Sequence, residues 1–352
     1  MKLPIAVLMT DTHADEDNLE LIDNIFQQAI QLSNDVGVRY IFHAGDFFKS
    51  RSKQSIECLL GMKETFSRFS KNDKIMFCIH GNHDKRDQNS AKGYMNLYKD
   101  RNVKLFEKFG VEIIGNVMFC MISFFPEGES FLDVYTELLT HIQDNYQQRV
   151  DKEKLIKVLI CHASINGVRN NDGTTVEGDV EVDFFEYFDR VFVGHYHDRQ
   201  KINNKIIYVG STHQANYGED EYKGFTVIYS DGSYKFHNAK FPLFIHEKIH
   251  VDDREEIQNF IKEHIGSNNN IRLTLVGSKE QVDSIQKSIK AESIDVRYES
   301  IEDSLINSVE DLNISTNITK TGLMNHWINY CKLNSVDNDL KIIGMKKFKN
   351  LI

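Results

Sequence analysis

Five short motifs contain residue types that bind divalent cations. In chain order they are Asp11-Thr12-His13, Gly45-Asp46, Gly81-Asn82-His83-Asp84, Cys161-His162 and Gly194-His195-Tyr196-His197. Carboxylate, amide and imidazole ligands together suit manganese, iron or zinc better than copper or an iron-sulfur cluster. Two ions about 3.5–4 Å apart can bind the attacking and the leaving oxygen of an in-line displacement at phosphorus, and one carboxylate must then bridge them. Asp46 is the candidate for this bridge.

Each motif is a weak signal when it is taken alone. A D-x-H triplet often arises by chance, a Gly-Asp pair is usually a turn, and a lone histidine such as His162 is more often structural than a ligand. Their placement strengthens the interpretation, because each motif directly follows a predicted buried strand, at residues 5–9, 39–43, 74–80, 156–161 and 190–193. Loops at the carboxyl ends of neighbouring strands converge on one crevice, so the sequence predicts a metal site there.

The first half of the chain alternates short apolar runs with longer amphipathic stretches. Apolar residues recur at helical spacing between residues 19 and 32, and Gly37 is placed to end that helix. Strands joined by helices predict an α/β fold with a central sheet covered on both faces. A β-rich part follows at residues 206–209, 224–229 and 234–236, with Asp231-Gly232 as a tight turn. We interpret residues 1–242 as one domain.

A second, smaller domain is predicted over residues 243–302. Strand and helix patterns alternate at residues 244–251, 254–265, 271–276, 279–289 and 294–298, which is typical of a small α+β unit. Residues 303–352 are interpreted as a linker followed by a C-terminal helical segment. The amphipathic stretch 322–333 either docks a partner protein or completes the core of the second domain.

The composition is that of a globular protein. The 352 residues are 41% apolar and 11% aromatic, enough for two domains, and no apolar run is long enough to span a bilayer. Without a signal-peptide layout, the expected compartment is the cytoplasm, of a bacterium or a phage-infected host. The five cysteines form no C-x-x-C pair, and we expect buried free thiols. The net charge of −10 argues against a pure DNA-binding domain, although two bound cations would add about four positive charges locally.

The motif series resembles the signature of the calcineurin-like metallophosphoesterases, over residues 1 to about 240. The resemblance implies a central β-sandwich flanked by helices. It also implies that one metal is held by Asp11, His13, Asp46 and His197, and the other by Asp46, Asn82, His162 and His195. His83, paired with Asp84, would contact the phosphate and help to protonate the leaving group. Mn²⁺ is the expected ion, with Mg²⁺, Fe²⁺ and Zn²⁺ as alternatives.

A second set of residues is similar to the SbcD-type nucleases of DNA repair and recombination. It comprises Tyr208-Val209-Gly210-Ser211, Tyr217-Gly218-Glu219 and Lys223-Gly224-Phe225. This resemblance implies DNA as substrate, an SbcC-type ATPase of the structural-maintenance class as partner, a homodimer, and a DNA-facing capping role for the second domain. The chain departs from the family at Asp15, where a glycine is frequent, and at Lys49. Asp15 either orients His13 or begins a helix.

Three function classes remain open on the sequence alone. The favoured one is a two-metal DNA exonuclease or endonuclease; the alternatives are a phosphatase or phosphodiesterase for small esters, and a non-enzymatic scaffold with a relic site. Arg86, Arg199 and Lys201 lie near ligand loops and either steer the phosphate backbone of DNA or are simply solvated.

Overall fold

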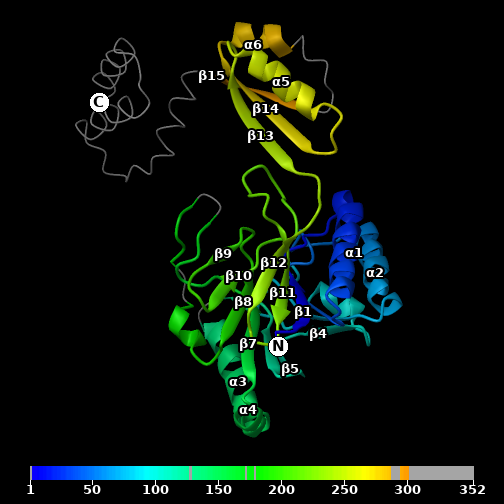
Figure 1. The fold of residues 1–352 in the computed structure, drawn as a ribbon, viewed down its shortest axis with the longest axis vertical. Helices are drawn as coiled ribbons and strands as arrows, with labels where there is room; N and C mark the ends of the chain where they lie inside the picture. Colours follow the sequence, from blue (N-terminus) through cyan, green and yellow to red (C-terminus); the bar gives the residue numbers. More distant parts are fainter. Residues whose placement is uncertain (1, 127–128, 171–172, 178–179, 287–293, 301–352) are drawn as a thin grey trace, which may run out of the picture. The chain divides into compact units, whose positions relative to one another are not determined.

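The fold is described from a computed structural model of the chain, which covers residues 2–126, 129–170, 173–177, 180–286 and 294–300. Backbone packing divides the chain into two compact units, Met1–Phe244 and a second unit that begins at Ile245. The first unit is a sandwich of two six-stranded sheets (Figure 1).

The first sheet has the order β12-β11-β1-β2-β3-β4. Its strands are β1 (Pro4–Met9), β2 (Tyr40–His43), β3 (Ile75–Ile79), β4 (Val103–Phe106), β11 (Gly224–Tyr229) and β12 (Tyr234–Asn238). β1 to β4 are parallel, whereas β11 pairs antiparallel with β1, so the sheet is mixed. The carboxyl ends of the parallel strands therefore lie along one edge of the sandwich.

The second sheet has the order β5-β6-β7-β8-β10-β9. Its strands are β5 (Phe109–Ile114), β6 (Val117–Ile122), β7 (Ile156–His162), β8 (Arg190–Gly194), β9 (Gln200–Lys201) and β10 (Ile206–Tyr208). β6, β7, β8 and β10 are parallel, and β5 and β9 are antiparallel strands at the two edges. The sandwich implied by the resemblance is confirmed, and the single covered sheet predicted from the pattern is replaced by two sheets.

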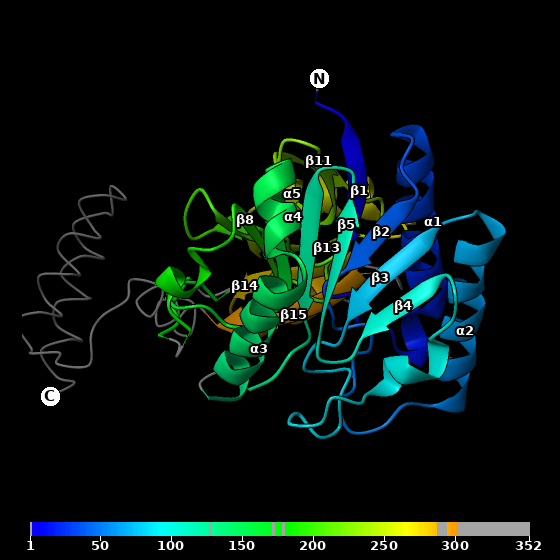
Figure 2. The ribbon, with the colours of Figure 1, turned by 90° about the horizontal axis from the view of Figure 1, so that it is seen from below.

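Helices cover the outer faces of the two sheets (Figure 2). The first sheet carries α1 (Leu19–Asp35) and α2 (Ile56–Lys71), and the second carries α3 (Glu129–Asn145) and α4 (Gln147–Glu153). Short 3₁₀ turns lie at Glu16–Asn18, Tyr94–Tyr98 and Val182–Phe185. α1 buries Ile22, Ile25, Phe26 and Ala29 at the three- and four-residue spacing that places them on one face of a helix.

Aromatic residues fill the layer between the two sheets. Phe42 on β2 and Phe119 on β6 are fully buried, and their ring centroids lie 4.5 Å apart. Phe42 also stacks on Phe77 of β3, with centroids 5.3 Å apart. This layer holds one sheet on the other and so fixes the relative position of their carboxyl ends.

The second unit contains a three-stranded sheet, β13 (Phe244–His250), β14 (Asn270–Gly277) and β15 (Ile294–Ser300), with α5 (Arg254–His264) and α6 (Lys279–Gln286). A separate hydrophobic core joins Ile257 and Phe260 of α5 to Leu273 and Leu275 of β14. These elements match the α+β pattern read from the sequence. The predicted amphipathic stretch 322–333 lies outside the described residues.

Cys58, Cys78, Cys120 and Cys161 are buried free thiols, as expected, and Cys331 lies outside the described part of the chain. Among the helices that the structure describes, none has both the length and the apolar character needed to cross a bilayer. Strands β4 and β5 and helices α2, α3 and α4 lie where no element was predicted.

We expect Phe42→Ala to lower the free energy of unfolding by about 3–5 kcal/mol, because it opens a cavity between the two sheets. Urea unfolding of the full chain measures the change. Leu60→Ala is the control: this α2 side chain is 57% exposed, and its truncation should change stability by no more than about 0.5 kcal/mol. Equal losses from the two variants would contradict the inter-sheet role of Phe42.

Candidate metal centre

The structure brings all seven predicted ligands to the carboxyl ends of strands from both sheets. Asp11 and His13 follow β1, Asp46 follows β2, Asn82 follows β3, His162 is the last residue of β7, and His195 and His197 follow β8. The first sheet thus contributes both carboxylates, and the second contributes three of the four imidazoles. These side chains can meet only if the two sheets pack with their carboxyl ends opposite each other.

The ligand atoms form two groups. Asp11, His13 and His197 make one, and Asp46, His162 and His195 make the other; within each group the atoms lie within 4.8 Å of one another. Asp46 Oδ2 lies 3.5 Å from His162 Nε2 and 3.7 Å from His13 Nε2, so it faces an imidazole of each group. This is the position that a bridging carboxylate requires.

Three of the imidazoles are oriented by an acceptor at the ring nitrogen that points away from the centre. A carbonyl or carboxylate oxygen needs a proton on Nδ1, and this leaves the Nε2 lone pair directed inward. The acceptors for His13, His162 and His197 are, in this order, Phe48 O at 3.3 Å, Ala44 O at 2.8 Å and Glu219 Oε1 at 2.8 Å. The tautomer that ligates a metal is therefore selected by the surrounding protein.

The inward-facing atoms fit cations. His13 Nε2 and His197 Nε2 lie 2.9 Å apart, and Asn82 Oδ1 lies 3.0 Å from both His162 Nε2 and His195 Nδ1. Lone pairs this close repel each other unless a proton or a cation lies between them. Oxygen and nitrogen donors in these two sets suit two divalent ions of the manganese, iron and zinc type.

The pKa shifts of the buried carboxylates and imidazoles also favour the binding of cations at the centre. Burial raises the pKa of the Asp11 carboxyl. Burial lowers the pKa of His13 and His195 to about 3, so both imidazoles are neutral. Burial likewise disfavours charge on His162, but Asp46, Asp11 and the Ala44 carbonyl together outweigh it and raise the pKa of His162 to about 9. The buried carboxylates thus attract a positive charge to the position that an ion would occupy.

Four of the ligand residues have backbone conformations that side chains rarely adopt. Asp11, His13, Asp46 and His195 have φ angles of +52°, +46°, +57° and +95°. Each such residue costs about 1–3 kcal/mol and persists only where the surrounding structure enforces it. Hydrogen bonds between the loops provide part of this restraint: His13 N–H donates to Asp46 O at 3.1 Å, and His195 N–H to Asp11 Oδ2 at 3.1 Å.

Two glycines are required by different constraints. Gly45 has a φ of +95°, which fits the turn expected there. Gly81 is needed for space instead, because a Cβ atom at this position would collide with Asp46 Oδ1 and with the Asp46 backbone nitrogen. The close approach of the Gly81 backbone thus limits the positions that the Asp46 carboxylate can adopt.

His83 lies beside the centre, and its ring is edge-on to that of His13 with centroids 5.1 Å apart. Its Nδ1 lies 2.6 Å from Lys49 O, so its partner differs from the expected Asp84. Asp84 instead accepts N–H bonds from Asp46, Phe47, Phe48 and Gly81, at 2.8 to 3.2 Å. Asp84 is therefore placed as a residue that positions the loops after β2 and β3.

The three candidate DNA-contacting residues are separated by the structure. Arg86 is exposed. Arg199 donates to Asn238 Oδ1 at 3.0 Å and lies over the Phe236 ring, so it is bound to β12. Lys201 is exposed and lies over Tyr234 of the same strand. Asp15 accepts from Glu16 N–H as the N-cap of a 3₁₀ turn, which favours the helix-start interpretation.

The sequence interpretation missed three residues at the centre. Arg51, in the loop after β2, lies with Nη2 at 3.0 Å from the outer atom of the Asn82 amide. Glu219 and Lys223 were noted only as parts of a family segment, yet they contact His197. The place of Glu219 and Lys223 in that family segment could have indicated a role at the centre. For Arg51, the indication in the sequence was its nearness to Gly45-Asp46.

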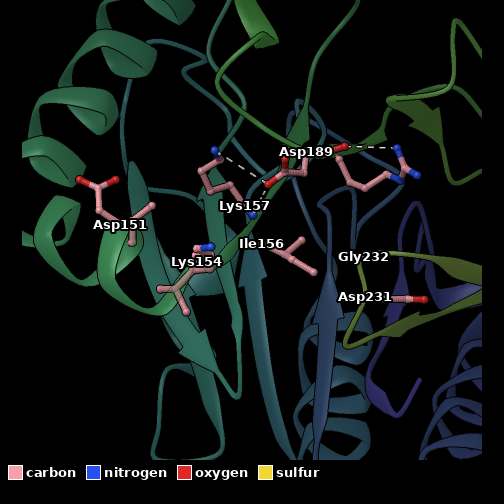
Figure 3. A pocket seen from close by; sticks show the side chains of 10 residues that line it. Asp151, Lys154, Ile156, Lys157, Asp189, Asp231 and Gly232 are labelled. Atoms are coloured by element: carbon pink, nitrogen blue, oxygen red, sulfur yellow. Dashed lines mark hydrogen bonds and ion pairs between the residues drawn. The ribbon is translucent and has the colours of Figure 1, made fainter. Parts of the chain in front are cut away.

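A separate cavity of about 620 Å³ lies where β7 and β8 begin. Figure 3 shows the side chains that line it. Ile156 and Arg190, the first residues of β7 and β8, line it together with Asp151, Asp189 and Asp231. The predicted ligands lie at the opposite ends of the same strands, so this cavity is not part of the metal centre.

A family model described as calcineurin-like phosphoesterase matches residues 5–199. The match spans more than half of the chain, and the chain belongs to this family. A dimetal phosphatase from Danio rerio matches 64% of this chain and 93% of its own chain, with a TM-score of 0.42 and 9% identity.

Three relatives are distant. The chain is 23% identical over 292 residues to protein 244L of Invertebrate iridescent virus 6, named as a phosphoesterase, and covers 95% of it. It is 27% identical over 256 residues to the DNA double-strand break repair protein Mre11 of Methanosarcina acetivorans, and 28% identical over 242 residues to the SbcD component of the nuclease SbcCD of Staphylococcus epidermidis. These alignments cover 68% and 62% of this chain, but only 39% and 63% of those two proteins.

We expect Gly81→Ala to abolish binding of at least one of two Mn²⁺ ions, because the added methyl group displaces Asp46. Calorimetric titration of the purified protein with Mn²⁺ measures the stoichiometry. Gly37→Ala is the control, since Gly37 also has a positive φ, +71°, but has no atom near the new methyl group. It should cost about 1–2 kcal/mol of stability and leave Mn²⁺ binding intact. Full Mn²⁺ binding by folded Gly81→Ala would contradict the packing argument.

Proposed function

We propose that the protein is a metal-dependent DNA nuclease that hydrolyses phosphodiester bonds with two divalent ions, for which Mn²⁺ is the expected choice. The observation that carries the proposal is the convergence of two ligand groups on Asp46, with His83 beside them. Similarity to an Mre11 protein and to an SbcD protein supports DNA as the substrate class.

When bound, the two ions would supply positive charge to polarise a phosphodiester and to orient the attacking and leaving oxygens. Asp11, His13, Asp46 and His197 would hold one ion, and Asp46, Asn82, His162 and His195 the other. His83 would act as the general acid. Because its Nδ1 is held by Lys49 O, its Nε2 is the atom that can deliver a proton to the leaving sugar oxygen.

Arg51 is the cation that we assign to the substrate phosphate. The outer atom of the Asn82 amide lies 3.0 Å from Arg51 Nη2, and this contact is a hydrogen bond only if that atom is the amide oxygen. Ligation of a metal by Asn82 needs the oxygen turned inward, which presents the amide NH₂ to Arg51 and removes its acceptor. The guanidinium is then free to bind a phosphate oxygen.

The remaining parts of the proposal rest on the resemblance of the chain to the SbcD-type nucleases. An SbcC-type ATPase is the proposed partner, a homodimer is the proposed assembly, and the unit that begins at Ile245 is the proposed DNA-facing cap. Among the described residues of that unit, Lys248, Arg272 and Arg297 lie on the sheet strands, although each is paired with Glu299 or Asp295.

The second candidate is a phosphatase or a phosphodiesterase for small esters. The match to nearly the full length of a viral protein named as a phosphoesterase favours it, and the net charge of −10 permits it. Turnover of a chromogenic phosphodiester, a phosphomonoester and DNA under the same metal discriminates the two, because a nuclease should strongly prefer the polymer.

We expect His83→Gln to reduce cleavage of DNA about 100- to 10,000-fold while both metals remain bound, because it removes the proton donor without removing a ligand. The assay uses end-labelled duplex and hairpin DNA with Mn²⁺, and calorimetry confirms the metal content. His141→Gln, on α3, is the control with wild-type cleavage. Wild-type protein that leaves every form of DNA intact, with the ATPase partner supplied, would refute the nuclease proposal.

We expect Arg51→Ala to raise the KM for DNA about 10- to 100-fold, since it removes a charge-assisted hydrogen bond to phosphate. Steady-state kinetics measure KM, and Mn²⁺ stoichiometry should not change. Lys53→Ala removes an exposed positive charge from the same loop and serves as the matched control. A KM change of equal size in the two variants would reduce the role of Arg51 to general attraction of the DNA.

A further inference from the structure

The segment 208–225 contacts both ligand loops of the second sheet. The buried Tyr208 hydroxyl donates to Ala163 O at 3.0 Å and accepts from Ile165 N–H at 2.9 Å, which fixes the chain just after His162. Ser211 N–H donates to His197 O at 2.9 Å. The segment that follows the last predicted ligand, His197, thus contacts both loops that carry ligands of the second sheet.

Glu219 makes the most direct of these contacts. Its carboxylate is buried, with 6% of the residue exposed, and Oε1 accepts from His197 Nδ1 at 2.8 Å. Oε1 also accepts from Asn216 Nδ2 at 3.0 Å, and Oε2 from Ala215 N–H at 3.2 Å. With its oxygens held in this way, Glu219 presents a fixed acceptor to the imidazole.

Lys223 contacts the same ligand residue from the backbone side. It is fully buried, and its Nζ donates to His197 O at 2.8 Å and to Asp198 Oδ1 at 2.5 Å. The same Nζ lies 3.4 Å from Glu219 Oε2. One lysine therefore holds the main chain of His197 and compensates the charge of the carboxylate that holds its ring.

A buried ion pair of this kind is a poor source of stability, because the desolvation of both charges offsets most of their attraction. Its contacts converge instead on one residue, the metal ligand His197. We propose that Glu219 and Lys223 are positioning residues that set the ring orientation, the tautomer and the backbone of His197, and so determine how tightly the Asp11–His13–His197 group binds its ion. This inference rests on the two-metal site of the proposed function but not on DNA as the substrate.

The test measures binding of Mn²⁺ alone by the purified full chain, with calorimetry for affinity and stoichiometry and electron paramagnetic resonance for coupling between two ions. Glu219→Ala should weaken one of the two ions about 10- to 100-fold and replace the coupled signal by that of a single ion. Glu219→Gln keeps an oxygen acceptor for His197 Nδ1 and should lose less affinity. Lys223→Met should weaken the same ion.

Glu107→Gln is the matched control, because it also breaks a Glu–Lys pair, with Lys99 at 2.6 Å, but one away from the ligands. It should bind two ions as the wild type does. If circular dichroism shows that Glu219→Ala does not fold, the test uses Glu219→Gln instead. Weaker binding of one ion by Glu219→Gln then supports the inference.

Wild-type affinity for both ions in folded Glu219 variants would overturn the inference and leave the proposed nuclease function standing. A wild type that binds two ions but does not cleave DNA would overturn the function and leave this inference intact. A wild type that binds no Mn²⁺ would overturn both.

Discussion

Two carboxylates, Asp11 and Asp46, lie almost completely out of solvent at the carboxyl end of the sandwich, and their need for positive charge governs the rest of the centre. The protein surrounds them with four imidazoles, and burial keeps His13 and His195 neutral. Neighbouring carboxylates raise the pKa of the other two, His162 and His197, against the effect of burial. Neutral ligands around buried anions leave a charge deficit that divalent cations would satisfy, which explains why polar side chains crowd an otherwise unfavourable position.

The sandwich is what makes this arrangement possible. Parallel strands end together in each sheet, and the aromatic layer that includes Phe42 and Phe119 keeps the two sets of ends opposite each other. The strained turns at Asp11 and Asp46 then aim side chains across the gap between the sheets. Strain at these residues is sustained by inter-loop hydrogen bonds, among them the four N–H groups that bind Asp84. The rigid strands and the strained loops thus together position the side chains of the centre.

Much of the fold and the ligand set could be predicted from the sequence, because a ligand residue next to a buried strand is a local pattern. The division into two sheets was harder to foresee: three strands of the second sheet were predicted, but a fully buried run such as β6 (Val117–Ile122) does not reveal which sheet it joins. The partners of His83 and Asp84 could not be predicted either. Their hydrogen bonds join them to Lys49 and to the loop after β2, and such contacts between distant segments leave no trace in residue spacing.

The position of β11 beside β1 has a consequence for the order in which the chain can fold during synthesis. β1 lies between β2 and β11, and Pro4 of β1 pairs with Tyr229 of β11. The β1–β11 pair therefore cannot form until more than two hundred residues have left the ribosome. Glu219 and Lys223 arrive in that same late stretch. Local units such as β2–α2–β3 can form earlier, whereas the ligand shell matures only as β11 docks. A nascent chain that stalls before β11 is synthesised would expose the unpaired edge of β1 to chaperones and proteases.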